Sequence, residues 1–368
     1  MLEYLFIAFL VISGVQVFFY VAFALFFPKK TKCATPSFSE PVSVLICAKN
    51  EAENLEQHLT HFESQNYKSF ELVLINDNSS DRTLEVMELF KASTQIPVKI
   101  VNVTPSEHFW GNKKFALTLG IKAASYEQLL FTDADCVPNS NNWISEMVSC
   151  ISATKNIVLG YGAYEKISKS FLNKIIRFET LLAAIQYFSY AKMGLPYMGV
   201  GRNLSYNKQT FFKARGFMDH MHIKSGDDDL FINQVATKTN TICQLSQESF
   251  TRSIPKKSFS EWILQKRRHI STATSYKRIH QFLLGLFHLS QILFFITSII
   301  MLITGFHWHL ALGLIGLRYF SFYVTIIIYG IRLKEIDLLL FAPFFELFLL
   351  LSQIYIFIQN LISKPKHW

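Results

Sequence analysis

The sequence has almost no charge at either end. Charged residues make up 17% of its 368 residues, yet Glu3 is the only one between Leu2 and Phe27, and charges are sparse again beyond Gln281. Half of the residues are hydrophobic, and 35 of them are Phe. This segregation excludes a fully soluble chain and is typical of a membrane protein with one extramembrane domain.

The N-terminal apolar segment lacks the marks of a removable signal peptide. No basic stretch precedes it and no small-residue cleavage site follows it, so we expect residues 1–28 to be a retained transmembrane anchor. Lys29, Lys30 and Lys32 follow directly. The positive-inside rule then predicts a cytosolic central domain in a multi-pass protein of the inner (plasma) membrane.

The cysteines lack the paired spacing of a zinc site or a disulfide framework. We therefore expect reduced thiols, most of them in the core, at these five positions: Cys33, Cys47, Cys136, Cys150 and Cys243. The sequence also contains no internal repeat and no low-complexity tract.

Residues 40–280 carry the pattern of an α/β domain. The predicted strands are Val42–Cys47, Glu71–Asn76, Val98–Val103 and Gln128–Thr132. The predicted helices between them are Asn50–Ser64, Asp81–Ala92 and Lys113–Ala124. Strict alternation with about 30 residues per unit indicates parallel βαβ winding. Ligands bind at the carboxyl ends of such strands, so the residues after each strand are the candidates for a site.

The rest of the chain returns to apolar helical segments. Ser168–Met193 has a helical pattern that fits either a helix along the membrane surface or an ordinary core helix. Residues 281–363 contain apolar blocks that predict three or four further transmembrane segments: Phe282–Gly305, Leu310–Tyr329 and Ile336–Ile362. Pro343 and Glu346 interrupt the last block, so a re-entrant hairpin that returns the C-terminus to the cytosol is the alternative to a crossing.

Acidic residues follow three of the four predicted strands. Asp133 and Asp135 come directly after the fourth strand, where two carboxylates can share a hard divalent ion that neutralises a diphosphate. Asp77 follows the second strand, and Asp81 is a good cap for the next helix. Glu51, after the first strand, fits a site residue or a solvated acid in a first helical turn.

A third acidic group and a basic segment lie further along the chain. Asp227, Asp228 and Asp229 are adjacent, and one of them could remove the proton of an acceptor hydroxyl, although a solvated loop is the alternative. Thr251–His280 contains eight Lys or Arg and one acid. These cations could serve a departing diphosphate or lipid headgroups.

Taken in order, seven stretches resemble the family 2 glycosyltransferases with a GT-A fold. The resemblance runs from about Pro41 to about His280 and is carried by VSVLICAKNEAENL, LVLINDNSSDRT, KKFALTLGIKAA, LLFTDADCVP, GVGRNLSYNKQTFFKARGF, SGDDDLF and QKRRH. The last motif and the flanking apolar segments are similar to membrane-bound members such as ceramide glucosyltransferases and polysaccharide synthases.

The resemblance implies a role for each matching residue. It implies Mg²⁺ or Mn²⁺ and the diphosphate at Asp135, a ribose or metal role for Asp133, and the nucleobase at Asp77. It implies the base at Asp227 or Asp228, depending on the alignment register. The full set implied for donor binding is Glu51, Asp77, Lys113, Asp133, Asp135, Gln265 and Arg268. The set implied on the acceptor side is Gly201, Arg202, Asn203 and His269.

These inferences together predict an inverting, metal-dependent glycosyltransferase. We expect it to move a sugar from a nucleotide-sugar, with UDP as the expected nucleotide, to a membrane lipid or a lipid-linked acceptor, and we expect no nucleic-acid partner. His269 stands where the processive synthases carry Trp, which argues against polymerisation. A processive polysaccharide synthase and a non-catalytic membrane protein that binds nucleotide-sugars are the alternatives.

Overall fold

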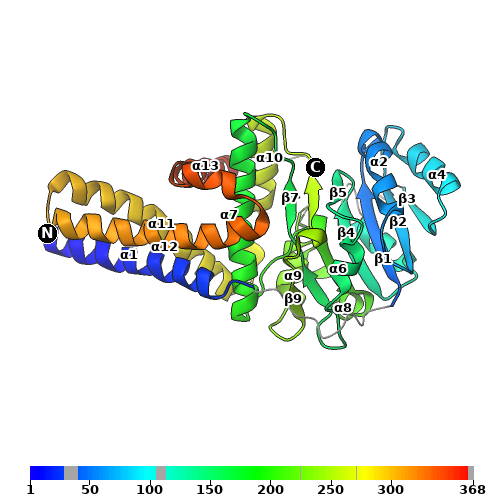
Figure 1. The fold of residues 1–368 in the computed structure, drawn as a ribbon, viewed down its shortest axis with the longest axis horizontal. Coiled ribbons are helices and arrows are strands. Elements are labelled where there is room, and N and C mark those ends of the chain that lie inside the picture. The colour runs from blue at the N-terminus through cyan, green and yellow to red at the C-terminus, as the bar shows by residue number, and fades with distance from the viewer. Residues whose placement is uncertain (29–39, 105–112, 224, 271, 364–368) are drawn as a thin grey trace.

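The computed structural model describes residues 1–28, 40–104, 113–223, 225–270 and 272–363, apart from the side chain of His269. It has two parts, an α/β domain and a group of long apolar helices that extends from one side of it (Figure 1). The predicted α/β class is confirmed.

A seven-stranded sheet forms the centre of the domain, in the order β3-β2-β1-β4-β8-β6-β9. Its parallel half consists of β1 (Val42–Ala48), β2 (Phe70–Asp77), β3 (Val98–Val103) and β4 (Gln128–Asp133). The other half, which the sequence did not predict because its strands are short, consists of β6 (Ile157–Leu159), β8 (Leu204–Asn207) and β9 (Thr241–Cys243). A smaller sheet contains β5 (Cys136–Pro138), β7 (Gly162–Tyr164) and β10 (Thr251–Ser253).

The parallel strands bury both faces, as strands between two helical layers must. Leu45 and Val73 lie in one core cluster with residues of α5 (Lys113–Ala123). Val44 and Leu72 face the opposite way, into a cluster with residues of α2 (Ala52–His58) and α4 (Thr83–Ser93). The shorter helices of the domain are α3 (Thr60–Glu63), α6 (Trp143–Val148), α8 (Lys208–Lys213) and α9 (Asp229–Val235).

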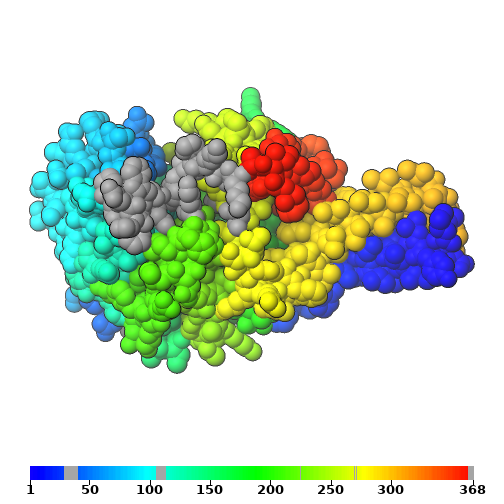
Figure 2. All heavy atoms as spheres, turned by 180° about the vertical axis from the view of Figure 1, so that it is seen from behind, coloured from blue at the N-terminus to red at the C-terminus, as the bar shows by residue number. Residues whose placement is uncertain are grey.

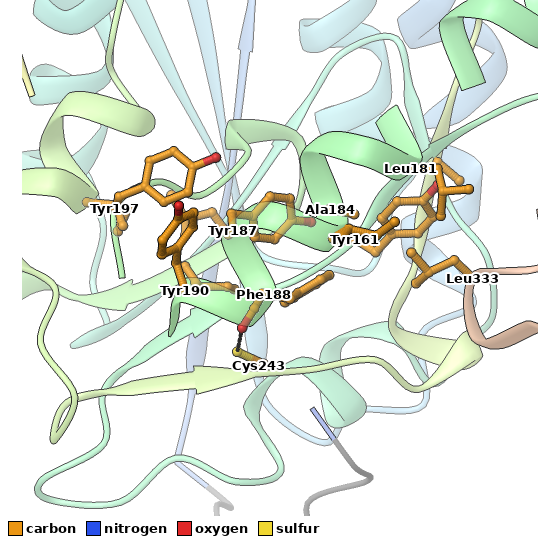
Figure 3. Packing of buried hydrophobic residues seen from close by; sticks show 14 of the residues in the cluster. Tyr161, Leu181, Ala184, Tyr187, Phe188, Tyr190, Tyr197, Cys243 and Leu333 are labelled. Atoms are coloured by element: carbon orange, nitrogen blue, oxygen red, sulfur yellow. Dashed lines mark hydrogen bonds between the residues drawn. The ribbon is translucent and has the colours of Figure 1, made fainter. Parts of the chain in front are cut away.

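Helix α7 (Phe171–Met193) joins the domain to the apolar helices. Tyr187 and Phe188 belong to the buried cluster drawn in Figure 3, where the Cys243 thiol of β9 approaches the carbonyl oxygen of Phe188. Ser189 contacts the apolar helices through the Tyr329 hydroxyl, at 2.6 Å, and the carbonyl oxygen of Phe23, at 3.2 Å. The helix is therefore a buried element at the junction of the two parts.

Four segments of the described residues are long and apolar enough to cross a membrane. They are α1 (Leu2–Leu25), α11 (Arg278–Thr304), α12 (Trp308–Leu333) and the continuous stretch of a 3-10 helix, η5 (Ile336–Phe341), with α13 (Ala342–Ile362). Helices α1, α11 and α12 run side by side, whereas α13 lies beside α7 (Figure 1). These segments indicate that the protein is a membrane protein.

An ion pair is buried among these helices. Arg318 of α12 and Glu346 of α13 are fully buried and bind each other through both guanidinium Nη atoms. Glu346 also accepts hydrogen bonds from the Tyr20 hydroxyl, at 3.0 Å, and from Gln291 Nε2, at 2.8 Å. All four helices thus contribute to one polar cluster, since Tyr20 belongs to α1 and Gln291 to α11.

Glu346→Leu is expected to destabilise the protein by about 3–5 kcal/mol, because it leaves the buried Arg318 charge without its carboxylate. The measurement is unfolding of the detergent-solubilised protein followed by heat or by denaturant. The double variant Arg318→Met with Glu346→Leu is the control and should recover most of the loss, since it removes both charges. A single variant as stable as the parent would show that the ion pair contributes nothing.

One expectation about the cysteines is wrong. Cys150 is disulfide-bonded. Cys47, Cys136 and Cys243 are free thiols, as expected. Sequence spacing gave no sign of the bond, because pairing depends on which cysteines the tertiary structure brings together.

Candidate functional site

The loops that follow β1 and β2 are tied to each other at the carboxyl edge of the sheet. Asn50 adopts a positive φ of 56°, and its Oδ1 accepts a hydrogen bond from the Ser80 amide at 2.8 Å. The Asn50 amide donates to Ser79 Oγ at 3.0 Å. Asp81 accepts hydrogen bonds from the Ala52 amide, at 3.2 Å, and from the Thr83 amide, at 3.0 Å, so its role is to hold two helix starts together.

Asp77 is the last residue of β2 and is buried. Burial raises the pKa of its carboxyl group, while the charges of Lys49 and Lys113 lower it to a smaller extent. The side chain therefore lies within the electrostatic reach of Lys113, at the same edge of the sheet. Register pairing supports this, because the ends of β1, β2 and β4 lie level with one another.

Lys113 links two of the acidic groups that the sequence keeps far apart. Its Nζ lies 2.8 Å from Asp133 Oδ1 and 3.3 Å from Asp227 Oδ2. Burial alone would lower the pKa of this ammonium group, but the two carboxylates outweigh burial and raise it. Lys113 therefore remains charged at the start of α5 and holds the loop of Asp227 against the end of β4.

Asp133 and Asp135 supply carboxylate oxygens at a candidate divalent-ion site. A carboxylate oxygen of each and the Sγ of Cys136 all lie within 4.8 Å of one another. Burial and the neighbouring charge of Asp133 raise the pKa of Asp135. Burial also raises the pKa of the Cys136 thiol, which donates a hydrogen bond to Asp135 Oδ1 at 3.4 Å. The thiol stays protonated, so the available ligands are carboxylate oxygens, which suit Mg²⁺ or Mn²⁺.

Positive charges border this pair on one side. The charges of Arg202 and Lys256 both lower the pKa of Asp135, which places them near its carboxylate. The Arg202 guanidinium lies 4.1 Å from the centre of the Tyr164 ring and donates to Ser253 Oγ at 3.0 Å. Glu51 also belongs to this region, because its pKa is raised by burial and, less strongly, by the charge of Asp135.

The three adjacent aspartates have different environments. Asp228 caps α9, and its two oxygens accept hydrogen bonds from the amides of Gly201 and Asp229, both at 2.7 Å. Burial and the charges of Asp227 and Asp229 raise the pKa of Asp228 to about 8. Asp227 is paired with Lys113.

Asp229 has different partners from the other two acids and has a structural role. Its Oδ2 accepts hydrogen bonds from Thr272 Oγ1, at 2.5 Å, and from the Tyr276 hydroxyl, at 2.6 Å. Both donors belong to the segment between α10 (Phe259–Ile270) and α11. The acidic loop is therefore anchored to the residues that lead into the apolar helices.

Lys114 binds the backbone that precedes the acidic loop. It is buried, and its Nζ donates to the carbonyl oxygens of His220, at 2.7 Å, and Ile223, at 3.0 Å. Burial lowers the pKa of its ammonium group to about 8. Neighbouring lysines of α5 thus have different functions: Lys113 contacts the acids, and Lys114 fixes the backbone that precedes them.

Some of these groups line one pocket. It is lined by residues of β1, β4, β8, α5, η1 (Gly201–Asn203) and the acidic loop, namely Cys47, Lys113, Leu117, Phe131, Thr132, Asp133, Gly201, Leu204, Tyr206, Asp227 and Asp228. The structure therefore brings Lys113, Asp133, Asp227 and Asp228 together around a shared space.

The residues expected on the acceptor side fall into different environments. Gly201 lines the pocket, and Arg202 lies near Asp135. Asn203 is fully buried, accepts a hydrogen bond from Trp143 Nε1, and donates to the carbonyl oxygens of Tyr161 and Ser249. Asn203 is thus satisfied inside the core, and we leave it out of the proposed acceptor site.

The residues expected on the C-terminal side of the domain lie on α10. Gln265 and Arg268 are half-buried there, and burial lowers the pKa of Arg268. His269 also belongs to α10, and its side chain lies outside the described residues. Their approach to a bound donor remains a prediction.

Two residues of the site have no signal in the sequence that singles them out. Cys47 lines the pocket as the penultimate residue of β1, where it resembles any core thiol. Lys256 is one of eight basic residues in its segment, and its place beside Asp135 and Glu51 follows only from the packing of the loop after β10.

Residues 43–218 match the sequence profile of the family described as "Glycosyl transferase family 2". The resemblance to this family that the motifs carry is therefore confirmed over these residues. A 98-residue stretch is 37% identical to the poly-beta-1,6-N-acetyl-D-glucosamine synthase of Staphylococcus epidermidis. Over the same length it is 33% identical to the enzyme of the same name from Staphylococcus aureus strain COL. The match covers 27% of this chain and 22% of each relative.

A solved structure supports the fold over nearly the whole chain. The mannosyltransferase PcManGT from Pyrobaculum calidifontis, in complex with GDP-Man and Mn²⁺, superposes with a TM-score of 0.62. The alignment covers 93% of this chain and 98% of that chain at 17% sequence identity. The similarity includes the apolar helices, and it confirms the GT-A fold.

Proposed function

We propose that this protein is an inverting glycosyltransferase that moves a sugar from a nucleoside-diphosphate sugar to a hydroxyl group of a membrane lipid or a lipid-linked acceptor. One observation carries the proposal. At one pocket, Lys113 Nζ lies within 3.3 Å of carboxylate oxygens of both Asp133 and Asp227. Residues separated by up to 114 positions converge there at the carboxyl edge of the sheet, where α/β proteins bind nucleotides.

The donor is assigned to the acidic edge of the pocket. Asp77 suits the nucleobase, because it ends the neighbouring strand and is buried. Asp133 and Asp135 would hold a divalent ion, which when bound would neutralise charge on the diphosphate as the glycosidic bond breaks. Lys113 and Arg202 supply fixed positive charge near the same carboxylates. The mannosyltransferase of the same fold carries a GDP-sugar and Mn²⁺, which supports a nucleotide-sugar and a divalent ion here.

Asp228 is the better candidate for the base that accepts the proton of the acceptor hydroxyl. Asp227 is held in an ion pair with Lys113, and Asp229 is occupied by Thr272 and Tyr276. Asp228 borders the pocket, and the Gly201 amide fixes the orientation of its carboxyl group. A base with a pKa near the working pH combines availability with basicity.

We assign the acceptor to the membrane because the acidic loop is hydrogen-bonded to the residues that lead into the apolar helices. Asp229 connects the loop of the proposed base to the residues just before α11. An acceptor anchored in lipid would therefore reach the pocket from the side of the apolar helices. We assign residues 40–280 to the cytosol, residues 1–28 to an anchor and residues 281–363 to the C-terminal membrane region, in the inner membrane, because three lysines follow the first segment.

A processive polysaccharide synthase is the second candidate, favoured by the similarity to the poly-beta-1,6-N-acetyl-D-glucosamine synthases of Staphylococcus. The chain spans 22% of the length of those relatives, so their activity does not transfer to this chain by itself. A synthase would build a polymer from donor alone, whereas a lipid glycosyltransferase stops after one sugar.

The test is to incubate the purified protein, Mg²⁺ or Mn²⁺ and a panel of UDP- and GDP-sugars with total membrane lipids, and to identify products by mass. We expect one lipid product that carries one added sugar. A ladder of polymers would favour the synthase. Nucleotide-sugar binding with no release of nucleotide under any condition would overturn the proposal in favour of a non-catalytic protein.

The rate of transfer should increase as the pH rises through about 8. Asp228 must lose its proton to act as a base, and its pKa of about 8 leaves it largely protonated at neutral pH. Asp227→Asn removes a neighbouring negative charge, so the rise should move to lower pH. The measurement is kcat/KM against pH for both proteins. A profile that is flat between pH 6 and 9, or one that Asp227→Asn leaves in place, would remove Asp228 from the role of base.

A further inference from the structure

The start of the α13 segment is tied to the α/β side of the molecule. Arg177 of α7 binds the carboxylates of Glu335 and Asp337, just before and within η5. Lys166, in the loop that leads into α7, donates to Asp337 Oδ1 at 2.8 Å. Since α7 packs on β9 and β7, these ion pairs fix the first turn of the segment at the border between the domain and the apolar helices.

The end of α13 is tied to the same side. Arg267 of α10 donates to Asn360 Oδ1 at 2.9 Å, and the Asn360 amide group returns a hydrogen bond to the Arg267 carbonyl oxygen at 3.0 Å. The Arg267 guanidinium also donates to backbone carbonyl oxygens of Gln359 and Ser363, which closes the last turn of the helix. Helix α10 follows β10 after a short loop, before the chain enters α11, and its Trp262 and Lys266 both contact Glu179 of α7, so it lies on the side of the domain.

A helix with both ends on one side cannot cross the bilayer. The 21 residues of α13 span about 31 Å at 1.5 Å per residue, close to the thickness of the hydrocarbon layer. If the helix crossed, its last turn would lie on the face opposite to η5 and out of reach of α10. The two views agree with this: α13 does not follow the direction of α1, α11 and α12 (Figure 1), and it lies close to the domain while those helices extend beyond it (Figure 2).

The two sides of α13 have different neighbours. Phe345 and Phe348 pack on the ring of Phe171 in α7, and Phe348 also packs on Phe259 in α10. The opposite side carries an exposed apolar stripe at helical spacing along its whole length: Phe344, Leu347, Leu351, Tyr355, Ile358 and Ile362. The other apolar helices also expose large apolar side chains, such as Ile296 and Ile303 of α11, so lipid is the occupant that the stripe fits.

We propose that α13 lies in the plane of the membrane, at the leaflet next to the α/β domain, and that the described chain crosses the bilayer three times, through α1, α11 and α12. The C-terminal end of α13 is then on the same side as the domain, and the N-terminus is on the opposite side. Length and composition alone would count α13 as a fourth crossing. The proposal does not depend on the chemistry of the pocket.

Reporter fusions in cells test the side of each loop. Two reporters are used, one that is active only in the cytosol and one that is active only outside it. Each reporter is fused after Trp368 of the full chain and, in separate shortened chains, after Lys334 and after Gly305. We expect the Trp368 fusion to match the Lys334 fusion and the Gly305 fusion to give the opposite signal. A Trp368 fusion that matches Gly305 would overturn the proposal.

Lysine substitutions test the depth of α13 independently. Leu351→Lys lies at the middle of the exposed stripe, and a lysine there can reach the headgroups if the helix lies at the surface. The matched control is Ile296→Lys, at an exposed position in the middle of α11, where the charge must enter the hydrocarbon. We expect Leu351→Lys to keep at least half of the parent amount of folded, membrane-inserted protein and Ile296→Lys to lose most of it. Equal losses in the two variants would overturn the in-plane position.

Discussion

Asp228→Asn is expected to lower the rate of sugar transfer by roughly a thousandfold, within the range of about 10²–10⁴ that a general base contributes. The amide keeps the size of the side chain and can still accept a hydrogen bond from the Gly201 amide through its oxygen. It cannot take a proton from the acceptor hydroxyl. Binding of the nucleotide should change little, because the residues assigned to the donor are untouched. The measurement is turnover under saturating donor, alongside nucleotide affinity.

The control for this result is Asp219→Asn. Asp219 is an exposed carboxylate that precedes the acidic loop and pairs weakly with Arg215 at 3.8 Å. Its substitution should leave turnover within about twofold of the parent, as for most surface changes. If Asp228→Asn transferred sugar at the parent rate while Asp227→Asn did not, Asp227 would be the base and the alignment register would shift by one residue.

Asp135→Asn is expected to lower transfer by about a hundredfold or more and to weaken binding of the divalent ion and the nucleotide together. Among the residues that the structure describes, Asp135 has no partner of opposite charge as close as the one that Lys113 supplies to Asp133, and its raised pKa reflects burial beside another carboxylate. A cation removes that repulsion, so the negative charge of Asp135 is most needed when the ion is bound. The amide variant supplies a weaker oxygen ligand and no charge.

The measurement is Mn²⁺ binding by electron paramagnetic resonance, with nucleoside diphosphate present, followed by transfer at increasing Mn²⁺. Asp133→Asn should also weaken binding of the ion. It should in addition remove the carboxylate closest to Lys113. Asp81→Asn serves as the control within the same edge of the sheet, since Asp81 binds backbone amides. Undiminished Mn²⁺ binding in Asp135→Asn would exclude this carboxylate as a ligand.

Much of the α/β domain could be predicted because its elements are local in sequence. The apolar runs at Val42–Ala48 and Phe70–Asp77 are long enough to be buried on both faces, and their alternation with helices specifies a parallel sheet. Parallel winding then places the residues after each strand at one edge. This is why Asp77, Asp133 and Asp135 could be assigned to one site before any coordinates.

The acidic triplet shows where prediction from sequence stops. The motif left the choice of base open between Asp227 and Asp228, because adjacent residues of one type have the same local signal and the alignment register allows either. Their roles differ through partners that are distant in sequence: Lys113 for Asp227, the Gly201 amide for Asp228, and Tyr276 for Asp229.

The amino-acid sequence by itself determined the class of the fold, the membrane character of both ends and the edge of the sheet where the acids gather, because these follow from periodicity, hydropathy and chain direction. Only the tertiary structure decided that Asp227 and Asp228 line the pocket while Asp229 is bound by Thr272 and Tyr276, that Asn203 is a core residue, and that α13 begins and ends on the side of the domain. The physical reason is that burial, pKa and orientation depend on contacts between segments far apart in the chain, and the helix ends of α13 are held by Arg177 and Arg267 rather than by its own composition.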